Sequence, residues 1–388
     1  MNTISELEQK LDRTPVDNFY AQLDADLRIF GVDLTSRKVS AIRVARYTKG
    51  YVDYAIVRRI YDRVHSFADW YLVWRDTAEE YVQFAQEAES KQRLITAGDC
   101  YLRASLMYHF AQLLLRQDDP AKAEAHSRSV NNYMRGAPYY DPPAERIDLP
   151  YLNTRIPGYL RVPHGTPRSP CAILFGGASS VKEEFHPQSD QLLRRGVATF
   201  AFDGPGQGEL APRHGGIPMD PDTFEHAVSN VIDCLEQRSE IDASRVGVYG
   251  QSVGGYLASR AGAVDSRIKA LIAGGGFFDL RDFPKWPVLT QEEVRGLFGF
   301  SSLAETRAFV KDRFSLVNTQ KRIHCPYLVL HAAHDDLSTV EEIRMMVDEA
   351  SGPAEFVLFQ DGVHGMGNRS FENASIVADW MTEKLNPS

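Results

Sequence analysis

A run of strand-forming residues leads directly into a glycine–serine–glycine turn at residues 246–255, and no other feature restricts the fold of this chain as strongly. The segment reads Val-Gly-Val-Tyr-Gly-Gln-Ser-Val-Gly-Gly, and a helical stretch follows it. Glycines on both sides of Ser252 let a strand and a helix pass each other closely, with the serine on a strained turn between them. This context favours a nucleophilic serine over a serine in an ordinary tight turn.

The residues on either side of this turn predict a mostly parallel sheet. After an expected hairpin at residues 147–162, short β-branched runs alternate with helical stretches, which is typical of a sheet covered by helices on both faces. Residues 277–318 break the alternation, and we interpret them as a small insertion between two strands. The predicted strands after the hairpin are residues 172–175, 198–202, 246–249, 270–273, 327–330 and 356–359.

The first third of the chain has a different pattern. Residues 1–137 read as successive amphipathic helices, with apolar residues three and four positions apart over residues 67–90. Another helix is predicted to begin at Pro120. Glycine and proline are dense over residues 136–143, so we place a domain boundary there and predict domains 1–137 and 138–388.

A serine hydroxyl becomes a good nucleophile only beside a base that a third group orients. Where a serine occupies a strand-to-helix turn of this kind, the acid and the histidine follow it in that order, each after a later strand. Asp335 comes after the next-to-last predicted strand, and Asp336 is the alternative acid. His364 comes after the last predicted strand. His331 and His334 compete for the role of base, but we interpret both as structural residues at a strand end.

The reaction also needs backbone N–H groups that stabilise a negative oxygen. The N–H of Val253 is one candidate, because it follows the serine at the beginning of a helix, where the helix dipole adds to its effect. The second donor is expected in the glycine-rich turn at residues 176–180, from Gly177 or Ala178. A tight turn needs glycine here for its own geometry too, and the two interpretations are compatible.

Three segments together resemble one branch of the α/β-hydrolases. They are residues 176–184 (Gly-Gly-Ala-Ser-Ser-Val-Lys-Glu-Glu), 202–209 (Phe-Asp-Gly-Pro-Gly-Gln-Gly-Glu) and 250–255 (Gly-Gln-Ser-Val-Gly-Gly). The branch includes 2,6-dihydropseudooxynicotine hydrolase and fungal hydrolases that shorten polyketide pigments. The resemblance implies an α/β-hydrolase fold with an N-terminal helical lid domain, and a substrate pocket between that domain and the sheet.

The same resemblance implies a triad of Ser252, His364 and Asp335 that needs no cofactor and no metal. Members of the branch hydrolyse carbon–carbon bonds next to a ketone, and others are esterases. Carbon–carbon hydrolases can carry an extra carboxylate after the sixth strand, but here Trp286 stands near that position. Carbon–carbon cleavage and ester or lactone hydrolysis therefore both stay open, and Asp279 is a further alternative for the triad acid.

Substrate-binding residues are expected among the aromatic side chains. Trp286 is one candidate, and four residues of the helical domain are the others, with packing in a helical core as their alternative role. Those four residues are Trp70, Trp74, Tyr101 and Phe110.

We interpret the charged residues beside the glycine-rich turn as structural and not as substrate-binding. We expect Lys182, Glu183 and Glu184 to form an exposed first helical turn, with the acids near the positive end of the helix dipole. Asp203 is expected to bind its own turn and to take no part in catalysis.

Composition excludes several function classes. The net charge is −9, so a nucleic-acid partner is not expected. The four cysteines lie far apart, which argues against a zinc ribbon and against a disulfide scaffold. No signal peptide and no apolar run of membrane-spanning length are visible. We expect a soluble, cytoplasmic hydrolase of a small molecule, with a homodimer as a possible assembly; the alternative is a non-catalytic, ligand-binding homologue.

Overall fold

The computed structural model describes residues 4–36, 38–39 and 44–386. The chain forms two compact units. Unit 1 comprises Met1–Asp141 and Pro287–Ala308, and unit 2 comprises Pro142–Trp286 and Phe309–Ser388. The first break follows shortly after the boundary that the sequence predicts. Within the predicted insertion 277–318, residues 287–308 belong to the helical unit.

Unit 1 is helical. The helix α6 begins at Pro120 as predicted, and the carboxylate of Asp119 caps it by accepting a hydrogen bond of 2.9 Å from the N–H of Ala121. The helices of this unit are α1 (Ile4–Thr35), α2 (Val44–Thr48), α3 (Tyr54–Tyr61), α4 (Phe67–Ser90), α5 (Leu94–Ala111), α6 (Pro120–Gly136), the short η2 (Ala137–Tyr139) and α10 (Val288–Phe298), while α11 (Leu303–Arg313) begins here and ends in unit 2.

A buried lysine joins α10 to the N-terminal helices of unit 1. The ammonium of Lys122 donates to the carbonyl oxygens of Gln112 (3.0 Å) and Leu115 (3.2 Å) and forms an ion pair of 3.2 Å with Glu293 on α10. Its side chain is only 2% exposed. A charge buried this deeply is stable only while its partners stay in place. Residues 287–308 are therefore an integral part of the helical unit.

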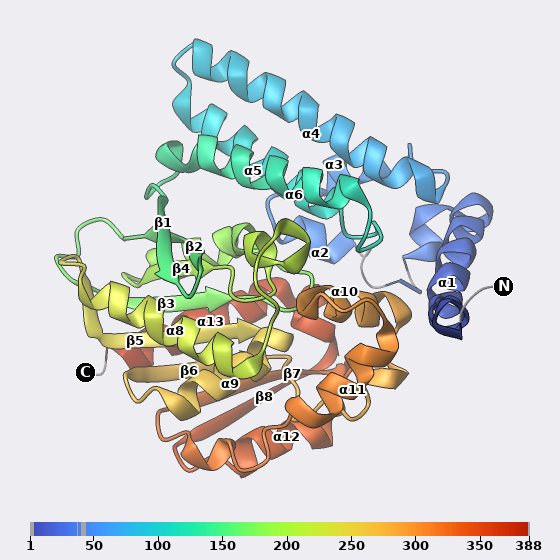
Figure 1. Ribbon diagram of the computed structural model, residues 1–388. Coiled ribbons are helices and arrows are strands. Elements are labelled where there is room, and N and C mark those ends of the chain that lie inside the picture. Colours follow the sequence, from blue (N-terminus) through green and yellow to red (C-terminus); the bar gives the residue numbers. More distant parts are fainter. Residues whose placement is uncertain (1–3, 37, 40–43, 387–388) are drawn as a thin grey trace. The chain divides into compact units, whose positions relative to one another are not determined.

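Unit 2 contains one eight-stranded sheet in the order β1-β2-β4-β3-β5-β6-β7-β8 (Figure 1). The predicted hairpin is present as β1 and β2, and β2 pairs antiparallel with β4; all later pairs are parallel. The strands are β1 (Glu145–Tyr151), β2 (Thr154–Arg161), β3 (Ser169–Phe175), β4 (Ala198–Phe202), β5 (Ile241–Gln251), β6 (Ile268–Gly274), β7 (Tyr327–His334) and β8 (Ala354–Val363).

Helices cover both faces of this sheet, which confirms the predicted fold class. Figure 1 shows α8 and α9 on one face and α13 on the other. Strands β3 and β4 are buried along their whole length, as expected for strands with helices on both faces of the sheet. The remaining elements are η3 (Lys182–Phe185), α7 (His186–Leu193), η4 (Gly208–Leu210), η5 (Pro212–His214), α8 (Pro221–Glu236), α9 (Val253–Val264), η6 (Phe283–Lys285), η7 (Gln320–Arg322), α12 (Val340–Asp348), η8 (His364–Arg369) and α13 (Ser370–Leu385).

Candidate active site

Ser252 lies between β5 and α9 on a backbone that serine rarely adopts. Its φ is 61° and its ψ is −125°, a conformation that strains any residue with a Cβ. The surrounding backbone leaves no room for larger residues, because a Cβ at Gly250 would lie 1.9 Å from the carbonyl oxygen of Gly254. The glycine spacing in the sequence is thus a requirement of the turn that carries Ser252.

Two hydrogen bonds connect Ser252 to an acid through a histidine. The Oγ of Ser252 lies 2.8 Å from the Nε2 of His364, and the Nδ1 of His364 lies 2.8 Å from the Oδ2 of Asp335. His364 directly follows β8, and Asp335 directly follows β7. The structure therefore brings together the three side chains that the sequence predicts as a triad, in the geometry that lets His364 accept a proton from the serine.

The carboxylate of Asp335 is buried and held by its own loop. Its side chain has no exposed surface, and its Oδ1 accepts a hydrogen bond of 2.9 Å from the N–H of Leu337. Burial alone would raise the pKa of this carboxyl. The charge and hydrogen bond of His364, together with the Leu337 N–H, outweigh burial and bring the pKa below its ordinary value. Asp335 is therefore the ionised partner that orients His364.

The alternative acids and bases do not take part in this chain of hydrogen bonds. Asp336 and His334 are exposed. His331 is buried, but its Nδ1 lies 3.9 Å from the carboxylate of Asp335, beyond hydrogen-bonding distance. The carboxylate of Asp279 pairs at 2.6 Å with the arginine two residues further along. The geometry favours Asp335 and His364 over each of these residues.

Aromatic side chains pack against His364 and bind the loop that follows Asp335. The ring of Phe277 is stacked on the imidazole of His364, with centroids 6.2 Å apart and an angle of 14° between the planes. Trp286 packs against Phe277 with centroids 4.7 Å apart, and its Nε1 donates to the carbonyl oxygen of Leu337 at 2.8 Å. Trp286 is 5% exposed. Its observed contacts are supporting ones, and a contact with substrate stays a prediction.

The predicted oxyanion donors lie beside the nucleophile. A Cβ at Gly177 would lie 2.8 Å from the Cβ of Ser252 and 3.0 Å from its Oγ, so the loop after β3 passes directly over the serine. Val253 is the first residue of α9, where a backbone N–H has no partner within the helix. In the part of the chain that the structure describes, the N–H groups of Gly177, Ala178 and Val253 form no hydrogen bonds with other residues. They are free to receive a substrate oxygen.

The four aromatic residues predicted in the helical domain lie in the core of unit 1. Tyr47 packs against Trp74 and Phe110, in each case with ring centroids 4.8 Å apart, and Trp70 packs against Trp74 at 5.6 Å. Tyr101 has no exposed surface and donates its hydroxyl to a glutamate at 2.9 Å. These contacts are those of a helical core, the alternative that the sequence leaves open.

The charged residues after the glycine-rich turn contradict the prediction of an exposed helical turn. Lys182 and Glu183 have no exposed side-chain surface, and Glu184 is half-buried. The ammonium of Lys182 pairs with Glu183 at 2.9 Å, with Asp203 at 2.8 Å and with Glu209 at 2.6 Å. The prediction fails because two of these partners, Asp203 and Glu209, come from a separate segment of the chain. Lys182, Glu183, Asp203, Glu209 and Arg146 are called the Lys182 cluster below.

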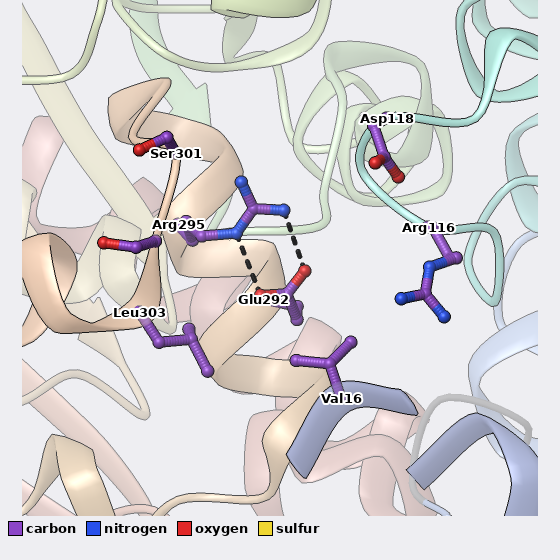
Figure 2. A pocket seen from close by; sticks show the side chains of 8 residues that line it. Val16, Arg116, Asp118, Glu292, Arg295, Ser301 and Leu303 are labelled. Atoms are coloured by element: carbon purple, nitrogen blue, oxygen red, sulfur yellow. Dashed lines mark hydrogen bonds and ion pairs between the residues drawn. The ribbon is translucent and has the colours of Figure 1, made fainter. Parts of the chain in front are cut away.

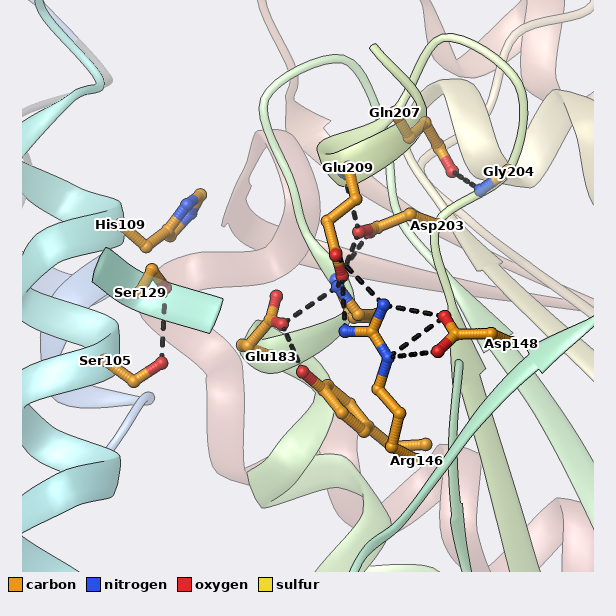
Figure 3. A network of polar contacts seen from close by, with 12 residues as sticks. Ser105, His109, Ser129, Arg146, Asp148, Glu183, Asp203, Gly204, Gln207 and Glu209 are labelled. Atoms are coloured by element: carbon orange, nitrogen blue, oxygen red, sulfur yellow. Dashed lines mark hydrogen bonds and ion pairs between the residues drawn. The ribbon is translucent and has the colours of Figure 1, made fainter. Parts of the chain in front are cut away.

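Further hydrogen bonds connect the members of the Lys182 cluster to one another and to Tyr159; Figure 3 shows this network. The guanidinium of Arg146 donates to both carboxylate oxygens of Glu209, and Tyr159 donates to Glu183 at 2.9 Å. Burial alone would raise the pKa of Glu209, but Lys182 and Arg146 lower it to about 2. Asp203 also accepts from the N–H of Glu209 at 3.2 Å, so it binds its own turn as predicted.

Unit 1 contains a separate small polar pocket (Figure 2). Within it, Arg295 forms an ion pair of 2.8 Å with Glu292. None of the triad side chains lines this pocket, so we assign it no function. Its lining residues are Val16, Arg116, Asp118, Glu292, Arg295, Ser301, Ser302 and Leu303.

The described residues contain neither a cluster of metal ligands nor a helix suited to a membrane. Among residues 4–36, 38–39 and 44–386, no group of three His, Cys, Asp or Glu side chains is placed to hold a metal ion. Over the same residues, no helix combines the length and the apolar character that a membrane span requires.

Comparison with known proteins identifies the family. Residues 2–282 match the model of the FrsA-like esterases, and residues 186–388 match that of the prolyl oligopeptidase family. The chain is 33% identical over 321 residues to 2,6-dihydropseudooxynicotine hydrolase of Paenarthrobacter nicotinovorans, an alignment that covers 81% of this chain and 84% of that relative. The chain belongs to the α/β-hydrolases. Within that family it is a serine hydrolase.

Further matches support the same branch of the α/β-hydrolases. The chain is 35% identical over 234 residues to a 20-hydroxy-prefusarin hydrolase of Gibberella moniliformis, which covers 56% of this chain and 55% of that relative. The crystal structure of 2,6-dihydroxy-pseudo-oxynicotine hydrolase superimposes with a TM-score of 0.83 at 30% identity, over 88% of this chain and 96% of that one. The resemblance predicted from sequence is confirmed, and a catalytic α/β-hydrolase is favoured over a non-catalytic homologue.

Proposed function

We propose that this α/β-hydrolase cleaves a small organic carbonyl compound through Ser252, His364 and Asp335. The observation that carries the proposal is the continuous chain of two 2.8 Å hydrogen bonds from the serine hydroxyl to a buried carboxylate. The bond broken is either an ester or lactone bond or a carbon–carbon bond next to a ketone. The two reactions share every step except the nature of the leaving group.

The geometry supports the following sequence of steps. The Oγ of Ser252 attacks the carbonyl carbon while its proton moves to the Nε2 of His364, and Asp335 stabilises the imidazolium. The N–H groups of Val253 and of Gly177 or Ala178 receive the negative oxygen of the tetrahedral intermediate. When the intermediate collapses, His364 returns the proton to the leaving group. Water then releases the acyl group from the serine by the same steps.

A carbon leaving group places one further demand on the substrate. Cleavage of a carbon–carbon bond expels a carbanion, which a neighbouring ketone stabilises as an enolate before His364 protonates it. An alkoxide needs no such neighbour. The names of the two hydrolases that this chain resembles do not identify the bond that it cleaves. We therefore keep both leaving groups in the proposal and separate them by experiment.

The test begins with a fluorophosphonate probe, which labels an activated serine covalently. We expect stoichiometric labelling of the intact protein and none of the Ser252→Ala variant. Unlabelled protein from the same preparation is then compared on p-nitrophenyl esters and on an aryl 1,3-diketone. Turnover of the diketone assigns carbon–carbon hydrolysis, and turnover of esters alone assigns an esterase. Labelling of the Ser252→Ala variant to the same extent would show that the nucleophile is misassigned.

We further propose that unit 1 takes part in substrate binding as a lid. The proposal is supported by the solved structure of the related hydrolase, whose match covers 88% of this chain and so extends into the helical unit. A chain beginning at Pro138 would also deprive Glu293 of its buried partner Lys122. We expect such a chain to aggregate or to retain weak activity on small esters only. Full activity on the full-size substrate would exclude the lid role, and a dimer that dissociates on truncation would indicate an assembly role.

A cytoplasmic location, a small-molecule substrate and a homodimer are also proposals. The location is supported by the four cysteines, each of which is a free thiol. The net charge of −9 supports a partner other than nucleic acid. Fractionation of cells and sedimentation of the purified protein test the location and the assembly state.

A further inference from the structure

The turn formed by residues 203–209 is bonded to both ends of the loop that passes over Ser252. The Nε2 of Gln207 donates to the carbonyl oxygen of Gly176 at 2.6 Å, at the beginning of that loop. Asp203 accepts from the backbone N–H of Lys182 at 2.9 Å and from its ammonium at 2.8 Å, at the loop's end. Gln207 is 2% exposed and Asp203 is 1% exposed. Water does not compete for these bonds, so they fix the loop firmly.

The side-chain amide of Gln207 is itself oriented by its surroundings. Its Oε1 accepts from the backbone N–H of Gly204 at 3.2 Å, as Figure 3 shows, and its Nε2 lies 3.5 Å from the carbonyl oxygen of Gly177. One end of the side chain must therefore accept a hydrogen bond, while the other must donate one. Among side chains of this length, only glutamine offers both without a charge.

The bond to Gly176 determines where the next N–H points. A peptide unit is planar and trans, so the N–H of Gly177 is directed away from the carbonyl oxygen that Gln207 holds. Gly177 lies against the nucleophile, since a Cβ there would be 3.0 Å from the Oγ of Ser252. Rotation of the peptide at residues 176–177 would turn this N–H away and leave a carbonyl oxygen in its place.

We propose that Gln207 is a positioning residue that holds the oxyanion hole in its active geometry. The inference rests on the proposed catalytic role of Ser252. Gln207 acts through the backbone of the loop and does not itself touch the substrate. Its value to the reaction is that the N–H donors need no reorganisation when negative charge develops.

The test replaces Gln207 by methionine, which has a similar length and shape but neither donates nor accepts strongly. Using p-nitrophenyl acetate, we expect kcat per active site, counted with the fluorophosphonate probe, to fall about 10- to 100-fold, with KM within about twofold of wild type. We expect the affinity for a trifluoromethyl ketone, which binds as a tetrahedral adduct of Ser252, to fall by the same factor as kcat/KM.

The matched control is Gln188→Met. Gln188 is also buried, and its Nε2 donates to a backbone carbonyl, that of Ala374, at 3.3 Å. It lies on α7, and the hydrogen bond that its Nε2 donates goes to Ala374 and not to the loop after β3 that passes over Ser252. We expect Gln188→Met to lower the melting temperature, while kcat per active site stays within about twofold of wild type.

Each outcome distinguishes this inference from the proposed function. Full activity of Ser252→Ala overturns the proposed function itself. If Ser252→Ala is inactive but Gln207→Met keeps the wild-type kcat per active site, the positioning role is wrong and the triad stands. If Gln207→Met fails to fold, Gln207→Asn takes its place, since the shorter amide keeps its polarity but no longer reaches Gly176. Wild-type kcat in Gln207→Asn would equally overturn the inference.

Discussion

The triad and the Lys182 cluster both lie in unit 2, but they satisfy their polar groups differently. His364 has 19% of its side chain exposed and Ser252 is half-buried, so both retain surface that a substrate can reach. Lys182 has no exposed side-chain surface and three carboxylate partners. The backbone is strained at Ser252 but regular at Lys182, which begins the short helix η3.

This difference separates a reactive site from the structure that supports it. A reactive site must leave hydrogen-bonding capacity unused until the substrate arrives, and it can tolerate strain if the surroundings maintain it. A supporting cluster gains stability by pairing its charges, because every unpaired buried charge is costly. Substitutions in the triad should therefore change activity more than stability, and those in the Lys182 cluster should do the reverse.

The largest expected effect is that of Ser252→Ala. We expect kcat to fall by about 10³-fold or more, because the nucleophile is removed, while the melting temperature stays close to wild type. Steady-state kinetics on a p-nitrophenyl ester and thermal unfolding check both parts. A variant with nearly full activity would remove the basis for contrasting the two regions.

The second prediction compares two neighbouring carboxylates. Asp335→Asn should lower kcat about 10³-fold or more, because an amide no longer holds His364 in the tautomer that accepts the serine proton. Asp336 is exposed, so Asp336→Asn should leave kcat within about twofold of wild type. Parallel kinetics of the two variants check this. The opposite order would place the acid one residue further along.

The third prediction concerns stability. Lys182→Met removes the only cation paired with both Glu183 and Asp203 in the described residues, so the free energy of unfolding should fall by about 3–5 kcal/mol. The control is Lys384→Met, since Lys384 is 33% exposed and pairs with Glu355; its cost should be at most about 1 kcal/mol. Urea unfolding of both variants measures the two values. Equal costs would mean that the Lys182 cluster contributes no more than a surface ion pair.

The fourth prediction uses pH. Lys182 and Arg146 outweigh the effect of burial and lower the pKa of Glu209 from an ordinary value of 4.5 to about 2, so the folded state binds its proton less readily than the unfolded state does. The resulting stability is fully present above pH 4.5 and is lost as the pH falls towards 2. Glu209→Gln should therefore be less stable than wild type at neutral pH, with a gap that narrows below pH 4.5. A gap that is constant from pH 7 to pH 3 would contradict this charge effect.

The smallest expected effect compares two inactive variants. Glycine adopts the backbone of residue 252 without strain, whereas alanine does not, so Ser252→Gly should be about 1 kcal/mol more stable than Ser252→Ala. Urea unfolding of the two proteins checks this. Equal stability would show that the turn is not strained in the folded protein.

The sequence predicts the triad better than it predicts the Lys182 cluster and the role of Gln207. The physical reason lies in the sheet. Ser252, Asp335 and His364 each follow a strand of a parallel sheet, and the ends of such strands converge at one edge. The local pattern of strands in the sequence is therefore enough to predict that these three residues lie close together. The hairpin, the parallel strands and the start of α6 are likewise visible from local residue types.

The Lys182 cluster is not predictable in this way. Lys182 and Glu183 look like an ordinary solvated helix start, and their burial depends on Arg146 from β1 and on the turn after β4. Gln207 gives only one signal, its place in the Asp-Gly-Pro-Gly-Gln-Gly segment. Which carbonyl it binds becomes visible only once the chain has folded.

The glycines near the nucleophile also decide where a library of variants can be useful. A side chain at Gly177 or Gly250 would collide with the serine or with the backbone. Gly367, three positions after the histidine, has an ordinary φ, and a Cβ there would meet no atom within 4 Å. Selection for new substrates can therefore leave residues 177 and 250 unchanged and vary position 367, where a Cβ has space three residues after His364.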